Sequence, residues 1–152
     1  MQTLSLNSEL LKDIFKYAKP LGHNEKPANL NLGFGFLYYG LVRALRPRHI
    51  LVIGSGFSFH NLGAFSWQGS SAPDPANEAF QDWLIETCTS PMPQSEREKR
   101  LVEWERAPSA RYCHPREEHL LPLHVCAGMA GMAGQVIFDD QILGKRGVAF
   151  LW

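Results

Sequence analysis

Several protein classes are excluded by what the sequence lacks. No apolar run approaches the roughly 18 residues that a membrane-spanning helix needs. The first residues lack the charged and apolar regions of a secretory signal. Neither charge is in excess, because Lys plus Arg and Asp plus Glu both total 15. Nothing therefore draws the chain to nucleic acid or to an anionic membrane, and we expect a cytoplasmic protein.

Cysteine is also scarce. The chain has three cysteines, Cys88, Cys113 and Cys126, and no two of them form a CxxC pair. A zinc ribbon or a thioredoxin-type redox site therefore has no basis in the sequence. We expect buried thiols, as in a reducing compartment.

The remaining composition is that of a folded domain. Hydrophobic residues make up 45% and charged residues 20% of the 152 positions, enough for a single core. Periodicity and stop signals predict helices and strands in alternation, which indicates one α/β domain over residues 1–152, with a central sheet flanked by helices. The expected helices are 5–19, 30–45, 77–88, 96–106 and 115–128, and the expected strands are 50–53, 135–138 and 148–151.

The first of these strands leads into a candidate site. Residues 50–53 are a continuous apolar, β-branched run that ends at Gly54-Ser55-Gly56, and His60 follows in the next loop. Catalytic residues of α/β folds gather at the carboxyl ends of strands. An imidazole with a pKa near ~6.5 can accept and return a proton at neutral pH, so His60 is a candidate acid/base residue. The alternative is a solvated loop histidine.

A second candidate lies in the stretch His114-Pro115-Arg116-Glu117-Glu118-His119, which directly precedes an apolar segment. A helix start needs a cap and one acid in its first turn, so two histidines around a Glu pair exceed what folding requires. We expect Pro115 to open a helix, with Glu117 and Glu118 in its first turn. A neutral His119 would suit Fe(II) or zinc. The alternative is a histidine packed in the core.

The motif Gly54-x-Gly56 has a further interpretation. A glycine turn after a strand also begins the S-adenosylmethionine site of methyltransferases. The acidic residue expected about 20 positions later, at the end of a second strand, is missing, because Asp74 falls within a Pro/Ser loop. A methyltransferase-like protein therefore stays an alternative.

Taken together, the motifs resemble a known family. The stretch ILVIGSGFSFHNL at 50–62 is similar to the strand, GSG turn and HN pair of class III extradiol ring-cleavage dioxygenases, the LigB superfamily. The resemblance is sharpest at HPREEHLLPLHVCAGMAG and continues to FDDQILGKRGVAFLW. It is greatest to the DOPA 4,5-dioxygenase-like subgroup and covers about residues 50–152. It implies the C-terminal half of that fold, with residues 1–49 as a helical lead-in outside the family.

The resemblance also implies roles for particular residues. It makes His60 the catalytic acid/base residue and His119 a metal ligand, and it places His114 and Asn61 at the substrate. The implied cofactor is non-haem Fe(II), with zinc possible in its place. The implied activity is cleavage of catechol-type rings with O₂, in the metabolism of aromatic compounds.

The chain departs from the family in its N-terminal part. In the family, two further histidine ligands come from an N-terminal half of more than a hundred residues, and only about fifty residues precede the match here. Either another chain supplies those ligands, such as a second copy across a homodimer, or the protein is a truncated form that is inactive alone. A non-catalytic remnant is the remaining alternative.

Overall fold

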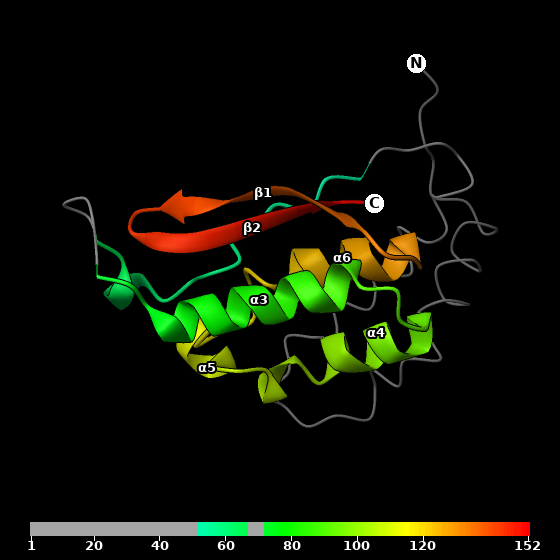
Figure 1. Cartoon of the computed structure of the whole chain (residues 1–152), viewed down its shortest axis with the longest axis horizontal. Coiled ribbons are helices and arrows are strands. Elements are labelled where there is room, and N and C mark those ends of the chain that lie inside the picture. Colours follow the sequence, from blue (N-terminus) through cyan, green and yellow to red (C-terminus); the bar gives the residue numbers. More distant parts are fainter. Residues whose placement is uncertain (1–51, 67–71) are drawn as a thin grey trace, which may run out of the picture. The chain divides into compact units, whose positions relative to one another are not determined.

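The computed structural model describes residues 52–66 and 72–152, and those from Gly54 onward belong to one compact unit (Figure 1). The helices expected at 5–19 and 30–45, and residues 50 and 51 of the expected first strand, lie outside the described residues. In chain order the elements are η3 (Leu62–Ala64), α3 (Pro75–Thr89), α4 (Gln94–Val102), η4 (Trp104–Arg106), α5 (Ala110–Cys113), α6 (Leu121–Ala130), β1 (Gln135–Ile142) and β2 (Lys145–Leu151). None of the helices in this described part is long and apolar enough to cross a membrane.

The long helix α3 confirms the helix expected at 77–88 and begins two residues earlier. Asp74 is its N-cap, since the carboxylate accepts a hydrogen bond from the backbone N–H of Asn77 at 3.1 Å, and Pro75 opens the first turn. Phe80, Leu84 and Cys88 lie at four-residue spacing on one face, and all three are fully buried. This face packs into the core.

The helix expected to open at Pro115 begins at Leu121 instead. Residues 115–120 form bends and turns, with both Leu120 and Leu121 donating their N–H to the carbonyl of Glu117. The physical reason is the second proline, Pro122, which occupies the first turn of α6, where its missing N–H costs nothing. No acidic residue lies in that first turn. The expected pairing of Glu117 and Glu118 with the helix dipole is therefore wrong.

The sheet also differs from expectation. Within residues 52–66 and 72–152 it is a two-stranded antiparallel hairpin, with no parallel strand among them. The predicted strand at 50–53 is not formed at its two described residues, and Ile53 is 80% exposed. A strand needs a neighbour to pair its backbone N–H and C=O groups, and a local apolar run does not supply one. The coarser prediction, a mixed α/β fold, is confirmed.

Both C-terminal strands are longer than the predicted 135–138 and 148–151, and only Leu143 and Gly144 separate β1 from β2. Both residues have positive φ, 52° and 73°. Positive φ at both central positions is the geometry of a type I′ turn, whose twist matches that of the flanking strands. Figure 1 shows β2 as the strand nearer to α3, with β1 at the outer edge. All eight residues of β1 are exposed.

The core lies where α3, α5 and β2 meet. Its fully buried side chains include Phe59, Phe80, Leu84 and Cys113, with Leu120 at 1% exposure. The expectation of buried thiols is confirmed for Cys88 and Cys113, while Cys126 is partly buried, and all three are free. Burial raises the pKa of Cys88 and Cys113 to about 12, so both stay as thiols.

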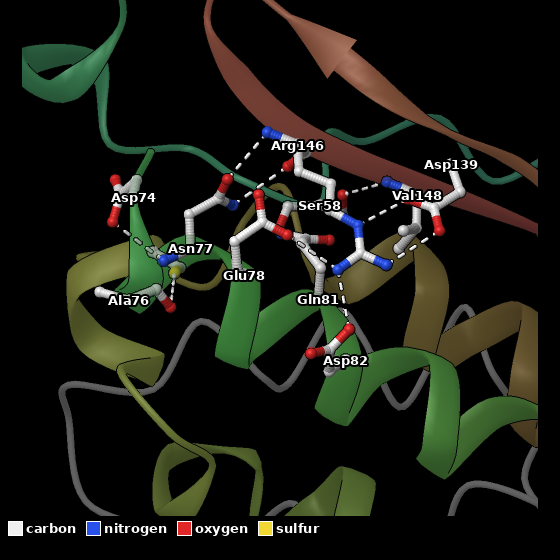
Figure 2. A network of polar contacts seen from close by, with 11 residues as sticks. Ser58, Asp74, Ala76, Asn77, Glu78, Gln81, Asp82, Asp139, Arg146 and Val148 are labelled. Carbon is white, nitrogen blue, oxygen red and sulfur yellow. Dashed lines mark hydrogen bonds and ion pairs between the residues drawn. The ribbon is translucent and has the colours of Figure 1, made fainter. Parts of the chain in front are cut away.

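Asn77 and Arg146 join α3 to the hairpin (Figure 2). The Asn77 side-chain amide donates to the Arg146 carbonyl at 3.0 Å and accepts the Arg146 N–H at 2.8 Å. The Arg146 guanidinium contacts Asp139 on β1 and Glu78 and Asp82 on α3. Asn77 is only 1% exposed. Its two bonds therefore replace water at partly buried backbone groups of Arg146.

We expect Asn77→Ala to lower the free energy of unfolding by about 1–3 kcal/mol, because it leaves a partly buried N–H and a partly buried C=O of Arg146 without their side-chain partner. Urea denaturation followed by circular dichroism measures this change. Asp82→Asn is the matched control, since its side chain is 69% exposed and an exposed ion pair contributes about 0–1 kcal/mol. Equal losses in the two variants would contradict this interpretation.

A second prediction concerns the hairpin turn. Leu143 holds a left-handed backbone conformation that glycine and asparagine adopt at lower cost. We expect Leu143→Asn to raise the free energy of unfolding by about 0.5–1 kcal/mol. The Leu143 carbonyl, which accepts the Ser66 N–H at 2.9 Å, is unchanged by the substitution. A loss of stability in the same urea experiment would show that packing of the leucine outweighs backbone strain.

Candidate functional site

His60 and His119 lie against each other although 59 positions separate them in sequence. Their ring centroids are 3.4 Å apart and the ring planes differ by 17°, so the imidazoles are stacked. His119 is exposed and His60 is partly buried. The two histidines expected to share a site are therefore side by side and open to solvent. Their roles stay predictions.

The segment that carries His60 is held by the end of α5. The His60 N–H donates to the Cys113 carbonyl at 2.8 Å, and the Asn61 side-chain amide donates to the Tyr112 carbonyl at 2.9 Å. Phe59, the residue before His60, is fully buried in the core. These contacts fix the backbone on both sides of His60.

Asn61 was expected at the substrate. Its side-chain N–H instead bonds a backbone carbonyl and helps to hold the segment. A contact of Asn61 with substrate stays a prediction.

His119 is positioned by the glycine turn. A Cβ added at Gly56 would lie 2.2 Å from the His119 carbonyl oxygen, and one added at Gly54 would lie 2.7 Å from the Cys126 sulfur. Only glycine allows such close approach of two backbones. The turn is thus a packing contact with the residues around the start of α6. The two glycines therefore serve the packing that brings His60 and His119 together. This use of the glycines does not favour the alternative of an S-adenosylmethionine site at Gly54-x-Gly56.

The electrostatic environment keeps His60 neutral. Partial burial and a positive charge on His119 lower the pKa of His60, while the Glu118 carboxylate acts in the opposite direction. The remaining charges of the stretch are paired on the surface, Glu117 with Arg111 at 3.1 Å and Glu118 with Arg116. A neutral imidazole is the form that accepts a proton or binds a metal.

His114 lies in the core. Its side chain is fully buried, and its Nε2 is 2.9 Å from the Ser58 carbonyl, to which it donates. Burial, partly opposed by this hydrogen bond, lowers the pKa of His114 to about 4. The ring packs between Phe80 and Trp104. The sequence did not single out Ser58, and it offers no local signal for a contact across 56 positions.

The described residues do not complete a metal site. Among residues 52–66 and 72–152 no group of three or more His, Cys, Asp or Glu side chains is placed to hold a metal ion. A facial iron site takes three protein ligands and leaves the other positions open. His119 and His60 provide two imidazoles at most. Iron or zinc therefore does not fit the described residues alone.

Comparisons with known proteins agree with the motifs over part of the chain. No family model matches. The dioxygenase tasH of Hapsidospora irregularis is 33% identical over 119 residues, which are 73% of this chain and 37% of that protein. The 4,5-DOPA dioxygenase extradiol of Beta vulgaris is 37% identical over 101 residues, 64% of this chain and 35% of that protein. The Escherichia coli (strain K12) protein with the same name is 31% identical over 80 residues, 53% of this chain and 29% of its own.

A solved structure is also similar. The crystal structure of an uncharacterised protein from Escherichia coli K12 matches 76% of this chain and 47% of that one, with a TM-score of 0.62 and 25% sequence identity. The chain spans about a third of the length of the curated relatives it matches. Over that part of their length, the chain is homologous to the dioxygenase tasH and the 4,5-DOPA dioxygenase extradiol proteins.

Proposed function

We propose that this chain carries the C-terminal half of an extradiol dioxygenase site, which opens catechol-type rings with O₂. His60 is the acid/base residue and His119 is one ligand of a non-haem Fe(II), or of zinc in its place. The observation that carries the proposal is the stacking of the two imidazoles, 3.4 Å apart, at an exposed position. Homology to proteins named as dioxygenases supports the reaction class.

The chemistry assigned to His60 follows from its surroundings. Its lowered pKa leaves the ring neutral near pH 7, ready to accept a proton from a phenolic hydroxyl. The Cys113 carbonyl holds the backbone N–H of His60, so the ring is attached to a fixed segment. A base must lie within hydrogen-bond distance of the proton it takes, and a fixed segment meets that need.

The half-site needs further ligands. We propose that they come from a polypeptide that supplies the part of the relatives' length not matched here, either another protein or a second copy of this chain. Such a partner would also cover the exposed His119. Water exclusion strengthens the electrostatic interactions inside a site, so the same contact would serve both ligation and catalysis.

A chimera tests the proposal. Residues 54–152 replace the matching part of the Beta vulgaris 4,5-DOPA dioxygenase extradiol, and the iron-loaded protein is assayed for yellow ring-opened product from DOPA. We expect turnover by the chimera. His60→Gln should lower kcat by about 10²–10⁴-fold without loss of iron, which is the usual range for removal of an acid/base residue. His119→Ala should lose iron as well as activity.

Arg116→Ala is the control for these substitutions, because its side chain is 71% exposed and takes no part in the stacked pair. It should keep both iron and activity. A chimera that folds and holds iron but leaves DOPA intact would refute the proposal. Unchanged iron in His119→Ala would refute the ligand assignment alone.

The glycine turn gives a separate prediction on the intact chain. Gly56→Ala should displace the backbone of His119, because the new methyl group meets the His119 carbonyl at 2.2 Å. We expect a loss of about 1–3 kcal/mol in unfolding free energy and altered nuclear magnetic resonance signals of the His60 and His119 rings. Gly63→Ala is the matched control, since its nearest neighbour, the Asn61 side chain, lies at an ordinary 3.6 Å. Equal responses would show that the glycine turn does not set the pair.

A further inference from the structure

We propose that His114 is a positioning residue, which acts through the Ser58 carbonyl to hold His60 against His119. The proposal deepens the function proposed above, since its catalytic consequence depends on the role of His60. Its structural content does not depend on iron or on substrate. It gives His114 a role other than the substrate contact implied by family resemblance.

The first step is the state of His114 itself. The side chain has 0% exposure, and its ring centroid lies 5.4 Å from that of Phe80 and 6.2 Å from that of Trp104. The acceptor at 2.9 Å is a carbonyl, so Nε2 carries the proton. Nδ1 is then an unprotonated nitrogen, and it has no hydrogen-bond partner among residues 52–66 and 72–152. The buried ring therefore makes one hydrogen bond, from Nε2 to the Ser58 carbonyl.

The second step is the residue that receives that contact. The Ser58 carbonyl accepts from both His114 Nε2 and Gln81 Nε2, each at 2.9 Å. The Ser58 hydroxyl accepts the Val148 N–H at 2.8 Å. Figure 2 shows Ser58 among the residues that link α3 to the hairpin. Ser58 is 5% exposed, so three buried donors fix this one residue.

The third step connects Ser58 to the site. His60 follows two residues later, and its N–H bonds the Cys113 carbonyl, the neighbour of His114. The chain then runs from His114 through the turn at 115–120 to His119. Residues 58–60 are thus attached to residues 113–114 at both ends. One imidazole of the pair, His60, belongs to the first segment, and the other, His119, follows the second segment by five residues. Loss of the His114–Ser58 bond would remove one of the two attachments to residues 113–114 and loosen the segment that carries His60, with Ser58 still held by Gln81 and Val148.

The simpler alternative is that His114 only fills the core. The two roles differ in their response to substitution. Phenylalanine keeps the ring and loses the donor, so core filling predicts that His114→Phe preserves the pair. Glutamine keeps an N–H donor near the Nε2 position and loses the ring. Positioning therefore predicts that His114→Gln preserves the pair and that His114→Phe does not.

The experiment measures the pair directly in the intact, metal-free chain. Ring protons of His60 and His119 at 3.4 Å stacking distance give a nuclear Overhauser effect between the two side chains. We expect this signal in the wild type and in His114→Gln, and its loss in His114→Phe. Trp104→Phe is the control, because it disturbs the same buried ring cluster without touching the hydrogen bond; it should keep the signal.

Should His114→Phe fail to fold, Gln81→Leu removes the other donor to the Ser58 carbonyl and should weaken the signal too. A signal that survives in His114→Phe, or that Trp104→Phe removes equally, overturns the proposal. Failure of the proposed function would appear differently. The chimera would then be inactive while the His60–His119 signal in the intact chain still responded to His114→Phe.

Discussion

The structure depends on hydrogen bonds between residues 58–61 and residues 112–114. Three hydrogen bonds join the two segments: the Ser58 carbonyl accepts from the His114 ring, the His60 N–H donates to the Cys113 carbonyl, and the Asn61 side chain donates to the Tyr112 carbonyl. Without this pairing the His60 N–H would lose its acceptor and the Ser58 carbonyl one of its two donors, and a buried polar group left unpaired costs about 1–3 kcal/mol. The pairing also brings two histidines that are far apart in sequence to one place. One contact thereby serves folding and the candidate site.

Local signals in the sequence were enough for some elements. The cap and proline at Asp74-Pro75 and the four-residue spacing of Phe80, Leu84 and Cys88 determine α3 from within fifteen residues. The start of α6 was misplaced because two prolines, Pro115 and Pro122, carry the same local signal. The turn at 115–120 places the His119 carbonyl against Gly56. The local sequence of that turn does not reveal this tertiary contact.

Of the predicted sheet, the two C-terminal strands are formed, whereas the described residues of the first are not in a strand. The composition of residues 50–53 predicts a buried strand, but a strand needs a neighbour that composition does not name. For the site, the residue types at 60 and 119 pointed to chemistry, and family resemblance joined them into one pocket. For His114, residue type and family resemblance were not enough. Its type and position suggested a contact with substrate, whereas its burial and its bond to Ser58 depend on long-range packing.

The histidines of the described residues differ in what the fold requires of them. His114 is buried and bonded to Ser58, and the ring nitrogens of His124 lie 3.0 Å and 2.7 Å from the carbonyls of Leu120 and Leu101. Replacing His114 would remove one of the two donors to the Ser58 carbonyl, and replacing His124 would remove the ring contact with the Leu101 carbonyl. His60 and His119 contact mainly each other, and His119 is exposed. Two imidazoles stacked at a position open to solvent bury little apolar surface and add little to the free energy of folding. Their stability contribution is small, while their capacity for proton transfer and ligation is large, and this contrast is the physical argument for chemistry at the pair.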